Sequence, residues 1–184
     1  LVGLKDEIKL RFLTEKGLAL VFALALPLAV GGAVLAKPIM ALIYGSEYLP
    51  GAAAFQILVV TILAVFPGTV LGNIVLAYDK QRKVAGYVAA TSIGNVMLNV
   101  LLIPPFGIVG AAIATIVVQM LFNGLMWRFM KHLAPFTVGR HLVKMGIATF
   151  IMGIIAFGLS SMGVHVLATI AIAALSYFAI LAIL

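Results

Sequence analysis

Long stretches without a charged residue alternate with short, charged segments along the chain. Residues 17–36, 52–78, 84–127 and 145–184 contain no Asp, Glu, Lys or Arg. A helix that crosses the hydrocarbon core of a bilayer needs about 20 predominantly apolar residues. The pattern therefore predicts one membrane-spanning segment in each of the first two stretches and two in each of the longer ones.

Turn-forming residues divide the two longer stretches. The run Pro104-Pro105-Phe106-Gly107 interrupts the first, because paired prolines remove two backbone donors and disfavour the helical region before them. The run Ser160-Ser161-Met162-Gly163 interrupts the second. Lipid offers no partner to backbone groups, and the segments are too long and too uniformly apolar for barrel strands, so we predict an all-α polytopic membrane protein. The six predicted spans are 17–43, 53–78, 84–103, 109–130, 142–159 and 164–184.

The first 16 residues have a different pattern, in which apolar positions recur among charges at helical spacing. Leu4, Ile8 and Phe12 share one face of LVGLKDEIKLRFLTEK, which predicts an amphipathic helix on the membrane surface. The predicted organisation is thus an interfacial helix over 1–16 and a six-helix lobe over 17–184. The chain has no initiator methionine, and no charge follows its last span, so we expect a piece of a longer protein.

Composition and charge support a membrane protein and exclude other classes. The chain is 65% apolar and 9% charged, against about 45–50% and 25% in soluble domains. It has no cysteine, which excludes a disulfide scaffold. Eleven of the twelve lysines and arginines lie in 5–16, 80–83 and 128–144. If the six spans cross the membrane in alternating directions, these three segments lie on the same side. The positive-inside rule then predicts two cytoplasmic termini, and the juxtamembrane charges meet lipid headgroups rather than nucleic acid.

Two prolines lie in the middle of predicted spans. Pro27 lies in the first span and Pro67 in the second, and each frees a backbone carbonyl at mid-membrane. Such a carbonyl needs a protein partner or a wet cavity. We interpret the prolines either as hinges beside a central cavity, as in alternating-access carriers, or as static kinks that improve packing.

Candidate substrate-binding groups are amides, hydroxyls and one lysine. Three pairs lie one helical turn apart, and each pair therefore shares a helix face: Thr69 and Asn73, Asn95 and Asn99, Gln119 and Asn123. They either line a cavity that binds sugar hydroxyls or hydrogen-bond between helices. Lys37, the one cation remote from the basic side, either receives an anionic headgroup or extends to the outer interface.

Several chemistries lack a sequence signal. All five acids lie outside the predicted hydrocarbon segments, so this chain offers no mid-membrane carboxylate for proton or sodium coupling. It also has no phosphate-binding glycine-rich loop and no metalloprotease or hydrolase motif, and its three histidines are not spaced as ligands. We therefore expect no enzyme, no metal and no cofactor.

Two segments resemble a known transporter family. LAKPIMALIYGSEYLPGAAAFQIL at 35–58 and NVMLNVLLIPPFGIVGAAIAT at 95–115 are similar to segments of prokaryotic oligosaccharide flippases, the polysaccharide-biosynthesis exporters. The resemblance implies the C-terminal six-helix lobe of a protein with twelve or more spans, in the multidrug/oligosaccharidyl-lipid/polysaccharide transporter superfamily. It implies that the protein, in the cytoplasmic membrane of a prokaryote, flips a lipid-linked oligosaccharide through a cavity shared with an N-terminal lobe.

Three other functions stay open on the sequence. Within the same superfamily they are a cation-coupled multidrug exporter and a peptidoglycan-precursor flippase. The third is a non-transporting membrane scaffold, in which the kinks and amides serve only packing. A coupled exporter would require a buried carboxylate from another part of the protein, because this chain supplies none.

Overall fold

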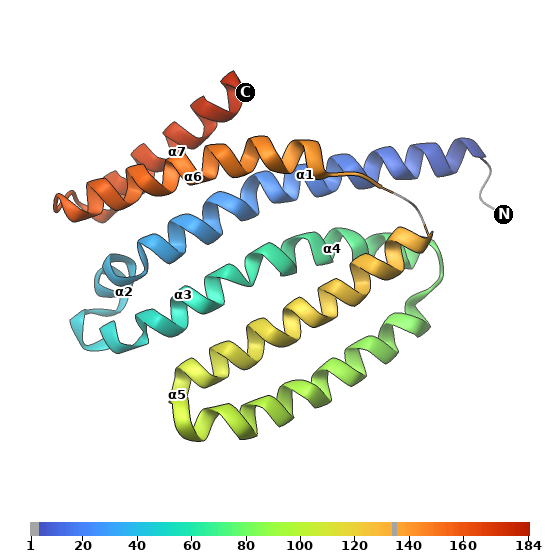
Figure 1. Ribbon diagram of the computed structural model, residues 1–184, viewed down its shortest axis with the longest axis horizontal. Coiled ribbons are helices and arrows are strands. Elements are labelled where there is room, and N and C mark those ends of the chain that lie inside the picture. The colour runs from blue at the N-terminus through green and yellow to red at the C-terminus, as the bar shows by residue number, and fades with distance from the viewer. Residues whose placement is uncertain (1–3, 134–135) are drawn as a thin grey trace.

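The computed structural model describes residues 4–133 and 136–184, and the regular elements in them are all helical (Figure 1). Five of these helices are long and apolar enough to cross a membrane. The elements are α1 (Leu4–Val34), α2 (Ala36–Tyr44), the short 3-10 helix η1 (Ser46–Gly51), α3 (Ala52–Val60), α4 (Ile62–Ala77), α5 (Gln81–Leu133), α6 (Gly139–Ser161) and α7 (Val166–Ile183).

The longest helix, α5, is a hairpin of two membrane-length arms. Its 53 residues would extend about 80 Å as one rod, more than twice the hydrocarbon thickness. The chain reverses at Gly107, whose φ of 56° and ψ of −134° lie in a region open to glycine. We call residues 81–106 the first arm and residues 108–133 the second arm. With the arms counted separately, the described residues hold six membrane-length helical segments, which agrees with the predicted six-helix lobe.

The predicted first span differs in its boundaries from the observed helices. The amphipathic segment is continuous with that span in α1, so no break separates residue 16 from residue 17; residues 1–3 lie outside the described part of the chain. The interruption comes instead at Leu35, between α1 and α2. Pro38 accounts for its position, because proline has no N–H to donate to the Val34 carbonyl and its ring crowds that carbonyl.

The predicted second span is also irregular at Thr61, between α3 and α4, although the φ of −61° and ψ of −21° of this residue remain helical. The Thr61 hydroxyl donates to the Leu58 carbonyl at 2.5 Å, and such side-chain bonds compete with the helical pattern. By contrast, α1 and α4 remain helical through Pro27 and Pro67. The interruptions therefore lie away from the two prolines that the sequence singles out.

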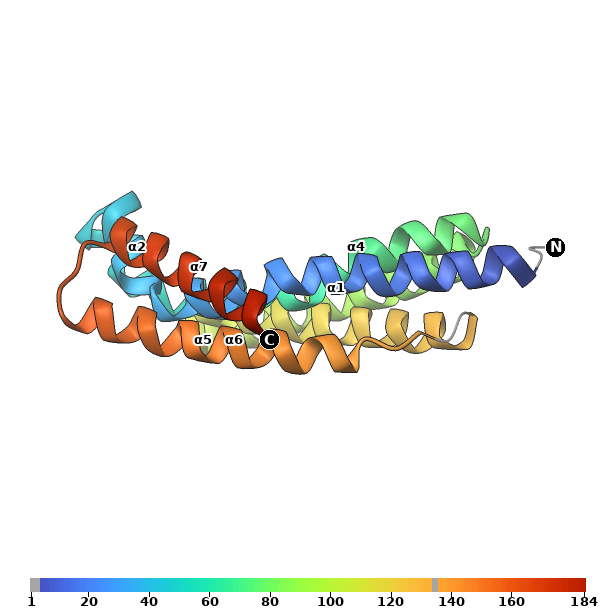
Figure 2. The same ribbon diagram turned by 90° about the horizontal axis from the view of Figure 1, so that it is seen from above.

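The helices follow one another across the bundle in the order α7, α6, α1, then α3 with α4, then the second arm of α5, with the first arm at the edge (Figure 1). The molecule is thin in the perpendicular view (Figure 2). Two buried clusters hold this row together. Leu18, Leu71 and Met126 join α1, α4 and α5, and Leu35, Met152 and Tyr177 join the end of α1 to α6 and α7.

Three aromatic rings connect α1, the second arm of α5 and the segment before α6. The Trp127 ring packs edge-on against Phe22, with centroids 6.4 Å apart, and against Phe136 at 4.9 Å. Edge-to-face contacts at these separations add to the burial of the rings. Trp127 thus contacts both α1 and the segment that leads into α6.

Candidate functional site

A polar groove lies between the two arms of α5, near the middle of each arm. Its cavity volume is about 570 Å³. Five of its lining residues are polar, although both arms are otherwise strongly apolar. The groove is lined by Val88, Thr91, Ser92, Asn95, Val96, Thr115, Val118, Gln119 and Phe122.

Two of the predicted amide pairs border this groove. Asn99 Nδ2 donates to the backbone carbonyl and the Oδ1 of Asn95, both at 2.9 Å. Asn123 Nδ2 likewise donates to the carbonyl of Gln119 at 2.8 Å and to its Oε1 at 3.3 Å. Each pair therefore lies on one helix face, with the first amide oriented by the second. Within the described residues, Asn95 Nδ2 and Gln119 Nε2 have no protein acceptor and remain as donors at the groove.

The threonine hydroxyls of the groove are tied to their own helices. Thr91 Oγ1 donates to the Tyr87 carbonyl at 2.8 Å, and Thr115 Oγ1 donates to the Ala111 carbonyl at 2.9 Å. Their oxygens can still accept a hydrogen bond through a remaining lone pair. The groove can thus present both donors and acceptors to a ligand with hydroxyl or amide groups.

Asn123 also packs against the helix that carries Pro67. A Cβ built at Gly68 would overlap Asn123 Oδ1, so the glycine is required for this close approach. Asn123 Oδ1 is buried and accepts no hydrogen bond from the described chain. Pro67, Gly68 and Asn123 border a second cavity of about 220 Å³. One predicted hinge and one predicted amide therefore come together at the α4–α5 contact.

The remaining predicted site residues lie outside the groove. Lys37 is exposed in the first turn of α2, and Thr69 and Asn73 are exposed on α4. The Thr69 hydroxyl donates to the Phe66 carbonyl of its own helix at 2.7 Å. The structure therefore does not gather all seven predicted binding residues into one cavity.

Two side chains that the sequence did not single out satisfy freed carbonyls of α1. Pro27 cannot donate to the Ala23 carbonyl four residues before it, and Tyr177 Oη of α7 donates to that carbonyl at 2.8 Å. Gln56 Nε2 of α3 donates to the Ala33 carbonyl, one of the last carbonyls of α1, at 2.9 Å. A proline predicts which carbonyl is freed, but no sequence pattern identifies a donor more than 150 residues away.

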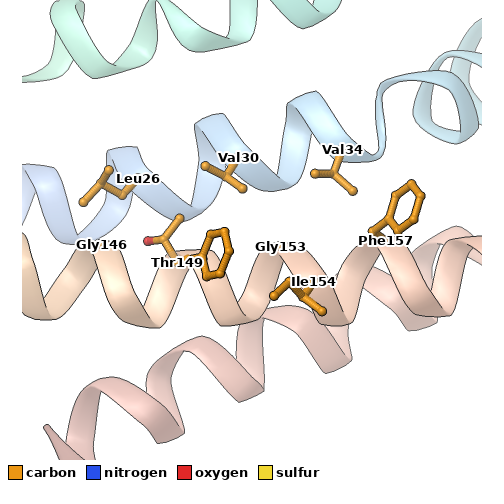
Figure 3. Close-up of a pocket in the computed structure, with 9 residues that line it drawn as sticks. Leu26, Val30, Val34, Gly146, Thr149, Gly153, Ile154 and Phe157 are labelled. Atoms are coloured by element: carbon orange, nitrogen blue, oxygen red, sulfur yellow. The ribbon is translucent and has the colours of Figure 1, made fainter.

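A separate apolar pocket lies between α1 and α6 (Figure 3). Leu26, Val30 and Val34 of α1 face α6 across a volume of about 500 Å³. On α6, Gly146 and Gly153 leave this space open. Its lining offers almost no polar surface, so it suits a hydrocarbon chain rather than a polar headgroup.

Glu15, just before the uncharged part of α1, anchors the segment that leads into α6. The backbone N–H of Thr137 donates to Glu15 Oε1 at 2.8 Å, and Arg11 Nε lies 3.1 Å from the same oxygen. The backbone hydrogen bond from Thr137 is the main cause that holds the pKa of Glu15 below its usual range. The ionised carboxylate is therefore part of the folded state at neutral pH.

Comparison with known proteins gives one family match. The family model described as "Lipid II flippase MurJ" matches residues 1–180, nearly the whole chain. No curated protein matches the chain. The match therefore covers both the helical lobe and the residues of its polar groove.

Proposed function

The chain belongs to the MurJ lipid II flippase family, and we propose that it forms one lobe of a flippase for lipid II, the lipid-linked precursor of peptidoglycan. The family match supports the flippase part of the main expectation from the sequence but not its finer part, a substrate among other lipid-linked oligosaccharides. It favours the peptidoglycan-precursor alternative from the same superfamily. The single observation that carries the proposal is the family match over 1–180.

The residues of the resemblance explain why it did not decide between the two substrates. Pro104 and Gly107 build the α5 hairpin, and Asn95 and Asn99 form the amide pair on its first arm. These are architectural features, which flippases with different headgroups can share. Fold-level similarity does not determine which headgroup is carried.

We propose that Asn95 and Gln119 bind the headgroup through the α5 groove. Their free amide donors and the neighbouring threonine oxygens complement the hydroxyls and amides of a sugar–peptide headgroup. Asn99 and Asn123 orient these two amides through the hydrogen bonds described above. The groove supplies polar contacts at mid-membrane without introducing a charge.

The residues outside the groove receive separate roles in this proposal. Lys37 is a candidate contact for the anionic diphosphate. Thr69 and Asn73 are exposed within Ser46–Leu76, a segment long and apolar enough to cross a membrane, where an amide facing lipid is costly. We therefore propose that this face of α4 turns toward the N-terminal lobe and the translocation pathway, in the cytoplasmic membrane of a prokaryote.

The substrate is tested by reconstituting the intact protein in vesicles and measuring translocation of fluorescently labelled lipid II by quenching from outside. A labelled lipid-linked oligosaccharide without a peptide is the comparison substrate. We expect translocation of lipid II and a much lower rate for the comparison. Preferential translocation of the oligosaccharide would restore the first expectation, and translocation of neither would favour a scaffold.

The binding groove is tested with Asn95→Leu and Gln119→Leu in the same assay. Loss of one hydrogen bond should lower the apparent affinity for lipid II about fivefold. Gln81→Ala, which removes an amide at the start of α5, is the control and should leave the affinity unchanged. Unchanged affinity in both groove variants would remove the groove from the binding site.

A cation-coupled multidrug exporter is less well supported. Among the described residues, Glu15, Glu47 and Asp79 lie at or beyond the ends of the uncharged stretches. No group of three acids, histidines or cysteines in that part of the chain is arranged to hold a metal ion. Coupling chemistry would thus have to come from elsewhere in the protein.

A further inference from the structure

The hydrogen bond between Tyr177 and Ala23 lies at the one carbonyl of α1 that Pro27 leaves without its helical donor. Proline at position 27 has no N–H, so the carbonyl of residue 23 loses its partner four residues later. The helix nevertheless continues through this point. The Tyr177 hydroxyl, 154 residues away in the chain, donates to the Ala23 oxygen at 2.8 Å.

The burial of Tyr177 makes this contact costly to lose. Tyr177 is 1% exposed and packs with Ala148, Met152 and Ala173 of α6 and α7. An unpaired hydroxyl or carbonyl in apolar surroundings costs free energy, and lipid offers no substitute partner. Breaking the bond therefore leaves the Ala23 carbonyl without its donor, whereas the Tyr177 hydroxyl keeps Thr149 of α6 as a polar neighbour.

The second donor to a freed α1 carbonyl is placed differently. Gln56 is exposed, and the Ala33 carbonyl that it contacts lies at the end of α1, where the Leu35 N–H still makes a helical hydrogen bond to the Gly31 carbonyl. A carbonyl at a helix end has other partners available. Tyr177 is therefore the donor on which the interior of α1 depends.

We propose that Tyr177 is a positioning residue that supplies the donor removed by Pro27 and thereby couples the position of α7 to the backbone of α1 at Pro27. A change in the direction of α1 at Pro27 would move the Ala23 carbonyl, and the tyrosine would have to follow or lose its partner. Conversely, a displacement of α7 withdraws the hydroxyl and destabilises the proline-containing turn. The coupling to transport rests on the proposed flippase function, whereas the hydrogen bond does not.

The coupling predicts a specific non-additivity between two substitutions. Tyr177→Phe keeps the ring but removes the donor, and we expect it to lower the apparent melting temperature of the intact protein by about 2–4 °C. Pro27→Ala restores a backbone N–H for the Ala23 carbonyl. In the Pro27→Ala background, Tyr177→Phe should therefore have less than half its effect, or should stabilise, because the hydroxyl has lost its acceptor.

The matched control is Tyr87→Phe, which removes the hydroxyl of a half-buried tyrosine on α5 and keeps its edge-on contact with Phe129. Its effect should be the same in the wild-type and the Pro27→Ala backgrounds. Equal costs of Tyr177→Phe in the two backgrounds would overturn the proposal, because the hydroxyl would then act independently of the proline.

Transport provides a second readout that packing alone would not change. With Pro27 present, we expect Tyr177→Phe to lower lipid II translocation per folded molecule about fivefold. In the Pro27→Ala background, the same substitution should leave the rate of that variant unchanged. A rate per folded molecule that is unaffected with Pro27 would refute the coupling to transport. If the wild-type protein does not translocate lipid II, the proposed function fails. The melting temperatures of the single and double variants still decide whether the Tyr177 hydroxyl replaces the donor that Pro27 lacks.

Discussion

At the scale of single residues, Gly68 shows how closely α4 and the second arm of α5 approach each other. Gly68→Ala places a methyl group on Asn123 Oδ1, and we expect a loss of about 1–3 kcal/mol from overpacking. Gly72→Ala, one turn away on the same helix with open space at its Cβ, should be neutral or stabilising by up to about 1 kcal/mol. Thermal unfolding of the intact protein measures both. Asn123→Ala should relieve the Gly68→Ala defect, and a defect that persists would contradict the contact.

Glu15 provides a pH-dependent prediction at the same scale. Its pKa is lowered in the folded state, so its contribution to stability is present above the unfolded pKa of about 4.3 and is lost as the pH falls through the lower folded value. Glu15→Gln should therefore cost about 1 kcal/mol at pH 7 and much less near pH 3. Melting temperatures at both pH values test this. Glu47→Gln, an exposed acid of η1, should cost little at either pH, and an equal loss in the two variants would argue against the Thr137 contact.

At the scale of elements, the sequence predicted the long apolar helical segments better than the points where each helix is interrupted. Uncharged stretches and the turn at 104–107 sufficed for these segments, because they depend on local composition and backbone chemistry. The interruptions at Leu35 and Thr61 were missed. At Thr61 a side-chain hydrogen bond replaces part of the helical pattern, and this competition leaves no mark in hydropathy.

The hinge prediction for α4 is that the helix bends at Pro67. Pro67→Ala restores a backbone donor and removes the ring, so folding should survive or improve. If α4 bends at this residue during transport, lipid II translocation by the intact protein should fall. Melting temperature and translocation rate are measured together. A loss of stability with an unchanged rate per folded molecule would assign Pro67 to packing.

At the scale of the whole molecule, the connections between helices alternate between the two ends of the bundle. The connections at 45–51 and 162–165 and the Gly107 turn lie at one end, and those at 78–80 and 136–138 lie at the other (Figure 1). The basic segments belong to the second end. We predict that cysteines at Ser46 and Ser160 react with an impermeant reagent from outside and that one at Gln81 does not. The chain has no native cysteine to interfere. The reverse labelling pattern would refute cytoplasmic termini.

The site was less predictable than the topology for a reason that also belongs to this scale. Helical spacing placed Asn95 with Asn99 and Gln119 with Asn123, because both relations lie within one helix. It did not show that the two arms would bring Asn95 and Gln119 to one groove while leaving Asn73 outside. It also did not pair Tyr177 with Ala23. Such relations depend on packing between helices distant in sequence, which the spacing of residues along one helix does not encode.

The Trp127 contact with Phe22 and Phe136 gives the molecule an optical reporter. Trp127 is the sole tryptophan of these 184 residues, and it sits where α1, α5 and the approach to α6 meet. Indole emission depends on local polarity and on neighbouring groups, so the fluorescence of this chain reads out one three-way junction without an attached dye. A shift of α1 against the second arm of α5 would change the emission maximum or the intensity of Trp127. This change allows the motion of α1 to be followed in real time.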